Sequence, residues 1–100
     1  MKIAVASSGK DENSQISPIS GRAEYYLIFE DKILKKTIKN PFTIGGGGAG
    51  PSVAQMLANE NIDLVISGTF GERMLDTLKE KNIKTKIIKD KTVKQIIEEI

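Results

Sequence analysis

The stretch IDLVISGTFG, residues 62–71, decides the fold class of this chain. Four of its first six residues are apolar, and three of these are consecutive, as in a buried strand. Glycines then break the strand, and residues 72–81 place three apolar side chains on one helical face. A buried strand that leads directly into an amphipathic helix is typical of α/β folds with parallel strands.

The same alternation continues on both sides of this stretch. Residues 51–59 predict a helix, because apolar side chains recur at helical spacing and Pro51 occupies the first turn, which tolerates proline. The apolar run KIAVAS, residues 2–7, predicts a central strand, and IKTKII, residues 83–88, predicts a fifth strand near an edge. Residues 92–100 begin with a capping box and continue with an apolar stripe, which indicates a closing amphipathic helix.

Two further strands complete the sheet. YYLIFE, residues 25–30, and ILKKTIK, residues 33–39, predict a hairpin whose Lys-rich second strand forms a solvated edge. The order β-β-β-α-β-α-β-α then gives an α/β fold with a mixed five-stranded sheet in the spatial order 3-2-1-4-5 and three helices. The length of 100 residues predicts a single domain, residues 1–100.

The polar segment 10–24 contains Pro18 and Gly21 and has neither a helical nor a strand period. We therefore expect a loop without regular structure. Loops of this length inside a small domain usually serve a function.

The composition excludes several functional classes. A net charge of +2 with few aromatic residues offers neither a strong field nor a stacking platform, so no nucleic-acid partner is expected. No apolar run approaches the roughly 20 residues of a membrane span, and no signal peptide is evident, so we expect a cytoplasmic protein without a membrane partner. The sequence has no Cys and no His, which removes the thiolate nucleophile, the imidazole base and most zinc sites.

Carboxylates are the remaining candidates for metal or hydrolytic chemistry. Their positions are scattered over a hairpin turn, a strand start and a helix, at Glu30, Asp31, Asp63 and Asp76. A two-metal site needs clustered carboxylates. We therefore expect neither catalytic residues nor metal ligands, and a protein that is not an enzyme.

The segment TIGGGGAGPS, residues 43–52, matches two nucleotide-binding patterns by spacing alone. A P-loop needs a lysine where this chain has Pro51, and a dinucleotide fingerprint needs a preceding strand and a later acidic residue, whereas Asp63 comes too soon. Two interpretations remain. Glycine amides that lead into a helix N-terminus bind anions, with Ser52 adding a hydroxyl, or the glycines form only a mobile connector.

The segment SPISGRA, residues 17–23, is a second candidate site. Arg22 lies beside a glycine in a loop, where a guanidinium can bind an oxyanion through two hydrogen bonds. The alternative is a salt bridge from Arg22 to Asp11, Glu12 or Glu24. α/β sheets bind ligands in the crevice outside the carboxyl ends of their parallel strands. We expect both candidate segments to converge there with the ends of the first and fourth predicted strands.

SPISGRA is followed by an aromatic strand, an Asn-Pro pair, the GGGAG loop, a helix, IDLVISG and the closing helix TVKQIIEEI. In this order of motifs the chain resembles the dinitrogenase iron-molybdenum cofactor biosynthesis family, the group of NifX and the NifB C-terminal domain. The resemblance covers essentially the whole chain. It implies a ribonuclease H-like fold with a mixed five-stranded sheet, and a role in binding or carrying iron-molybdenum cofactor or its iron-sulfur precursor during nitrogenase assembly.

The residues that match the family pattern are Ser17, Gly21, Arg22 and Ala23, and in the glycine loop Gly46, Gly47, Gly48, Ala49 and Gly50. Because the chain lacks His and Cys, a cluster would be held through its negative charge by backbone N–H groups, an arginine and hydroxyls. The complete expected cofactor-binding set is Ser7, Ser8, Gly9, Ser17, Gly21, Arg22, Gly46, Gly47, Gly48, Ala49, Gly50, Ser52, Gly68 and Thr69.

Two functional hypotheses follow. The first is a non-enzymatic carrier or binding domain for a small anionic ligand or metal cluster, which meets a protein partner in cofactor assembly. The alternative is a regulatory or assembly adaptor that binds a protein partner through Lys35 and Lys36 of the edge strand and through the long loop, with a vestigial pocket.

Overall fold

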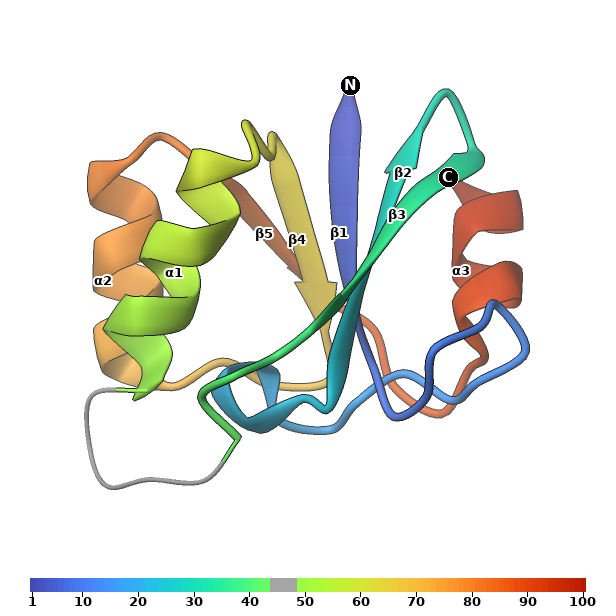
Figure 1. Cartoon of the computed structure of the whole chain (residues 1–100), viewed down its shortest axis with the longest axis horizontal. Helices are drawn as coiled ribbons and strands as arrows, with labels where there is room; N and C mark the ends of the chain where they lie inside the picture. The colour runs from blue at the N-terminus through green and yellow to red at the C-terminus, as the bar shows by residue number, and fades with distance from the viewer. Residues whose placement is uncertain (44–48) are drawn as a thin grey trace.

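A computed structural model describes residues 1–43 and 49–100 of the chain. Figure 1 shows a central twisted sheet with helices on both of its sides. In chain order the elements are β1 (Lys2–Ser7), the 3₁₀ turn η1 (Ser20–Arg22), β2 (Tyr25–Glu30), β3 (Ile33–Lys39), α1 (Ala49–Asn59), β4 (Leu64–Ser67), α2 (Glu72–Glu80), β5 (Lys84–Ile87) and α3 (Val93–Glu99). Among these residues, no helix combines the length and the apolar character that a bilayer span requires.

The five strands lie in the order β3-β2-β1-β4-β5, which confirms the predicted topology. β1 is antiparallel to β2 and parallel to β4, so Val5 lies between Leu27 and Ile66 in the ladder. β3 is antiparallel to β2 and forms one exposed edge, as its lysines predict. The crossover through α2 makes β4 and β5 parallel, and β5 forms the other edge.

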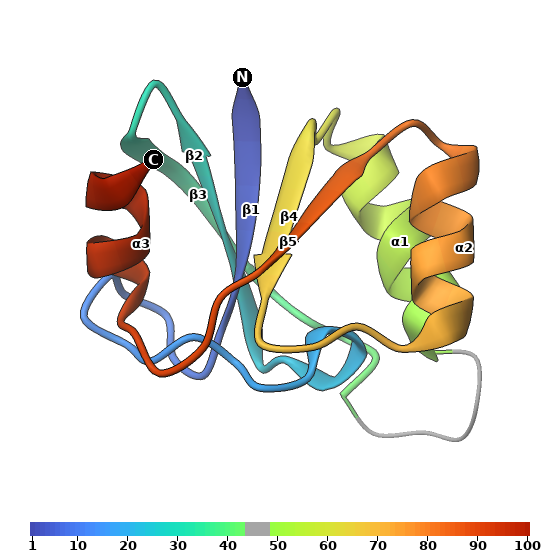
Figure 2. The ribbon, with the colours of Figure 1, turned by 180° about the vertical axis from the view of Figure 1, so that it is seen from behind.

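Two hydrophobic clusters cover the two faces of the sheet. Figures 1 and 2 show α1 and α2 on one side and α3 on the other. Tyr26, Leu57 and Leu78 are fully buried in the cluster beneath α1 and α2. Phe29 and Ile96 are fully buried in the cluster beneath α3. Removing each such side chain from water contributes roughly 1.5–3 kcal/mol, so both faces stabilise the sheet.

The predicted capping box fixes the start of α3. Thr92 Oγ1 accepts a hydrogen bond from the Gln95 N–H at 3.2 Å, and Gln95 Oε1 accepts one from the Thr92 N–H at 2.9 Å. The other element ends lie within two residues of the expected positions, with α1 beginning at Ala49 instead of Pro51. Such differences reflect how helix ends fray.

The segment 10–24 is not the unstructured loop that its composition predicts. Ile16 is buried in the cluster beneath α3 and forms an isolated β-bridge with Ser7. A second bridge joins Gln15 to Thr92, and η1 lies in the same segment. A single buried apolar residue generates no sequence period, which is why the pattern missed this packing.

Candidate functional site

A pocket of about 280 Å³ lies where η1 meets the first turns of α1 and α2. Figure 1 shows these three elements at the same end of the sheet, where the parallel strands β1 and β4 finish. The pocket is therefore at the carboxyl ends of the parallel strands, where α/β sheets bind ligands. The residues that matter most below are Gly21 and Arg22 from η1, Ala49 and Gly50 from α1, and Arg73 and Met74 from α2.

Two glycines lie where the three elements meet, but only Gly50 is needed for their close approach. A Cβ atom on Gly50 would lie 2.9 Å from the Cβ of Met74, closer than real Cβ contacts come. A Cβ atom on Gly21 would lie 3.5 Å from the Cα of Gly50, which is an ordinary contact. Gly50 therefore has a packing role, because only a residue without a side chain lets α1 approach the start of α2 this closely.

Both arginines of the sequence line this pocket. Arg22 and Arg73 are exposed, and neither makes an ion pair with a described residue. The salt bridge considered above as an alternative for Arg22 is therefore not formed. Glu72 is the only carboxylate among the described lining residues, so the side chains around the pocket carry a net positive charge.

The start of α2 adds to this positive field. Gly71 is the N-cap residue, and no side chain caps the helix. The Leu75 N–H donates to the Gly71 carbonyl at 3.0 Å, so the amides of Glu72, Arg73 and Met74 precede the first bond of the helix and have no acceptor within it. Uncapped N–H groups and the partial positive charge of a helix N-terminus attract anions.

η1 is fixed to the sheet by two fully buried side chains, Ser20 and Tyr26. The Tyr26 hydroxyl donates to the Ser20 carbonyl, and the Ser20 hydroxyl donates to Tyr26 Oη at 2.8 Å. Burial raises the pKa of Tyr26 above its usual range, and the hydrogen bond with Ser20 offsets part of that effect. Tyr26 thus stays neutral and holds the residue that precedes Gly21.

Asn40, which is buried, ties η1 to the chain that follows β3. Its Nδ2 donates to the carbonyls of Gly21 at 3.2 Å and Ala23 at 2.9 Å. Its Oδ1 accepts a hydrogen bond from the Phe42 N–H at 2.9 Å. One amide side chain therefore orients the backbone on both sides of Arg22.

The hydroxyls predicted at the end of β1 bond within the protein. Ser7 Oγ donates to the Gly9 carbonyl at 2.6 Å and accepts from the Gly9 N–H at 3.2 Å. Ser8 Oγ donates to the Gln15 carbonyl at 2.9 Å. These three residues are not among the described residues that line the pocket, so they support the loop after β1 rather than the pocket wall.

Two more expected residues, Gly68 and Thr69, line a different pocket of about 380 Å³. Thr69 Oγ1 donates to the Pro18 carbonyl at 2.6 Å, and Ser17 Oγ donates to the Ile19 carbonyl at 3.0 Å. A Cβ atom on Gly68 would lie 2.7 Å from the Cα of Pro18. Gly68 therefore lets the loop before η1 pack closely against the end of β4.

The remaining expected residues belong to the glycine segment and α1. Ser52 is half-buried in the first turn of α1 and is not among the described lining residues of either pocket. Gly46, Gly47 and Gly48 lie outside the residues that the structure describes.

Arg73 is the functional candidate that the sequence pattern missed. It follows Gly71 closely at the start of a helix, as Arg22 follows Gly21 in η1. A glycine followed closely by an arginine occurs at both places, in η1 before β2 and at the start of α2, and this is the signal available in the sequence. Only the fold shows that the two arginines border one pocket. Among the described residues, no three carboxylate, imidazole or thiol groups come together as metal ligands, so the site can bind by charge and hydrogen bonds.

Comparison with known proteins identifies relatives of the chain. The sequence model described as "Dinitrogenase iron-molybdenum cofactor" matches residues 1–100. The apo form of the orange protein from Desulfovibrio gigas aligns with a TM-score of 0.90 and 24% identity, over 97% of this chain and 83% of that one. A Thermotoga protein provisionally named NifB aligns with a TM-score of 0.84 and 28% identity, over 97% of this chain and 84% of that one. No curated protein matches the sequence.

Proposed function

The chain belongs to the dinitrogenase iron-molybdenum cofactor family, and from that premise we propose that it binds an anionic metal cofactor or its precursor as cargo without catalysing a reaction. The observation that carries the proposal is that both arginines of the chain, Arg22 and Arg73, line one pocket at the carboxyl ends of the parallel strands. The other thirteen basic residues of the chain are lysines, which provide positive charge for solubility as well as arginine does. An arginine differs because its guanidinium offers a planar pair of donors to an anion.

The donors around the pocket suit a negatively charged cargo. Hydrogen bonds from charged donors contribute about 1.5–3 kcal/mol each, and the uncapped start of α2 adds amide donors beside Arg73. The single carboxylate of Glu72 opposes this only partly, because two arginines line the same pocket. The net field favours an anion with several acceptor atoms on its surface.

Donors that hold a cargo without bonding to its metal also suit a carrier, which must release the cargo to an acceptor. Soft metal ions prefer thiolate and imidazole ligands, and the chain contains no Cys and no His. A metal–sulfide cluster would therefore keep its own ligands and present its outer sulfur or oxygen atoms to Arg22, Arg73 and the helix amides. Binding without a metal–protein bond allows release to an acceptor without ligand exchange.

The glycine segment is part of this proposal through its described end. Ala49 and Gly50 line the pocket at the start of α1. We include Gly46, Gly47 and Gly48 in the proposed site because the family pattern contains them. Ser52, Ser17, Gly68 and Thr69 are proposed to act only by supporting this end of the domain.

The experiment is an anaerobic titration of ¹⁵N-labelled protein with tetrathiomolybdate and, separately, with molybdate. The expected result is a set of amide shifts at Gly21, Arg22, Gly50 and Arg73 that saturates with the added anion. Sulfate at matched ionic strength is the control for unselective charge effects. Shifts spread over the lysines of β3 and β5, with none around the pocket, would overturn the proposed site.

A further inference from the structure

The outer edge of β5 is open in the part of the chain that the structure describes. β5 is the last strand of the sheet, and all four of its residues are exposed. The Lys84 N–H donates to the Asp63 carbonyl at 3.0 Å, and the Ile88 N–H donates to the Ser67 carbonyl at 3.1 Å. Because backbone groups alternate along a strand, the N–H and C=O groups of Thr85 and Ile87 point away from β4 toward the open edge.

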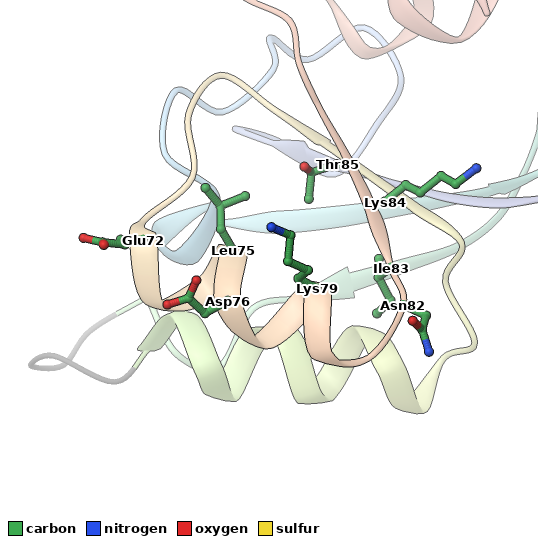
Figure 3. Close-up of a pocket in the computed structure, with 8 residues that line it drawn as sticks. All are labelled: Glu72, Leu75, Asp76, Lys79, Asn82, Ile83, Lys84 and Thr85. Atoms are coloured by element: carbon green, nitrogen blue, oxygen red, sulfur yellow. The ribbon is translucent and has the colours of Figure 1, made fainter.

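A groove of about 850 Å³ runs beside this edge, between β5 and α2. Figure 3 shows Leu75 and Lys79 of α2 and Thr85 of β5 bordering the same space. Leu75 is 37% exposed, and Ile87 farther along β5 is 59% exposed. An added strand would cover these apolar side chains while its backbone bonded to β5.

The two faces of β5 differ in charge. Lys84 pairs with Leu64 and Lys86 pairs with Ile66, so both lysines lie on the sheet face opposite α1 and α2. Neither lysine makes an ion pair with a described residue. A strand beside β5 would therefore gain from carboxylates on the lysine face. On the groove face, apolar side chains would pack against Leu75 and Ile87, between the charged residues Glu72, Asp76 and Lys79.

We propose that the β5 edge and the adjoining groove bind an extended segment of a partner protein as a sixth strand, with acidic residues alternating with apolar ones. Main-chain hydrogen bonds to Thr85 and Ile87 would provide affinity, and the alternating side chains would provide specificity. This surface lies on other residues than the anion pocket, apart from Glu72, so a bound partner and a bound anion can occupy the domain together.

A second copy of this chain is a poorer occupant of the same edge. Two β5 strands would bring lysine next to lysine, and like charges on neighbouring strands are destabilising. On the other edge, β3, the charge of Lys36 is less available to a partner's carboxylate, because its Nζ already donates to both carboxylate oxygens of Glu60 at 3.0 and 2.9 Å. Thr37 Oγ1 further donates to the Lys10 carbonyl at 3.4 Å.

The test uses the full chain labelled with ¹⁵N and two short peptides, one alternating valine with glutamate and one alternating valine with lysine. The glutamate peptide is expected to shift the amides of Thr85 and Ile87 and to slow their hydrogen exchange severalfold. The lysine peptide is expected to leave both unchanged. Equal shifts with both peptides, or shifts confined to β3, would overturn the proposal.

Two variants keep the result interpretable. The double variant Lys84→Glu and Lys86→Glu is expected to prefer the lysine peptide, since only the sign of the exposed charges changes. Thr85→Pro removes an outward N–H without removing a bond to β4, and it is expected to weaken binding if the fold persists. Binding of the glutamate peptide undiminished by charge reversal would contradict the inference, as would concentration-dependent dimerisation through β5 in sedimentation.

Discussion

Gly50 and Met74 meet so closely that a Cβ atom on the glycine would lie 2.9 Å from the Cβ of the methionine. This contact joins the first turn of α1 to the first turn of α2 and sets the width of the pocket between them. The glycine therefore acts through packing, whatever its amide contributes to binding.

Gly50→Ala is expected to destabilise the domain by about 1–2 kcal/mol. Overpacking a tight contact costs roughly 1–3 kcal/mol, and the better helix propensity of alanine returns up to about 1 kcal/mol. Urea unfolding measures the change. Gly71→Ala is the comparison: nothing lies within 4 Å of its added Cβ atom, so it loses only the preference of the N-cap position for glycine over alanine. An equal loss in both variants would contradict the packing role of Gly50.

Asn40→Ala is expected to cost about 2–4 kcal/mol and to weaken anion binding at the same time. It leaves the buried carbonyl of Ala23 without its partner, at a cost of about 1–3 kcal/mol, and removes two part-buried bonds, to the Gly21 carbonyl and from the Phe42 N–H. Unfolding and anion titration are both measured. Asn59→Ala is the control, since Asn59 is exposed on α1. Full stability together with full affinity in Asn40→Ala would show that this side chain positions nothing.

Tyr26 predicts an alkaline loss of stability. Its pKa is raised in the folded state above the ordinary 10.0, so the unfolded chain loses the phenol proton first as the pH rises. The contribution of the protonated Tyr26 to the free energy of unfolding is fully present below pH 10.0. It is lost as the pH rises from 10.0 toward the raised pKa of the folded state.

Tyr26→Phe is therefore expected to lose about 1 kcal/mol near neutral pH, from the hydrogen bonds with Ser20, and to show a shallower alkaline decline than the wild type. Tyr25→Phe is the control, because it removes a half-buried tyrosine from the same strand. Urea unfolding across the range from neutral to alkaline pH makes the comparison. Parallel declines in wild type and Tyr26→Phe would contradict this assignment.

Much of the fold could be predicted from the sequence because the strands and helices carry strong periods. The apolar runs that became β1 and β4, and the capping box at Thr92, gave the correct elements and strand order. The bridge between Ser7 and Ile16 could not be predicted, because it depends on one buried side chain in a polar segment.

The candidate site was predictable only in part. Arg22 stood out beside Gly21 in the sequence, whereas Arg73 resembled an ordinary exposed helical residue. Contacts between η1, α1 and α2 join the two arginines around one pocket, and such contacts depend on the tertiary fold. The sequence predicts the hydroxyls of Ser7 and Ser8 as ligand donors, but it does not show that they bond to the carbonyls of Gly9 and Gln15.

The central claim is that Arg22 and Arg73 together bind an anionic cargo. The most direct test is an anaerobic calorimetric titration with tetrathiomolybdate of the wild type, Arg22→Ala, Arg73→Ala and the control Lys94→Ala, whose lysine is exposed on α3. We predict a loss of about tenfold or more in affinity for each arginine variant, and a loss that is larger at low salt than at high salt. The Lys94 variant should bind as the wild type does. Unchanged affinity in both arginine variants, or an equal loss in the Lys94 control, would contradict the account.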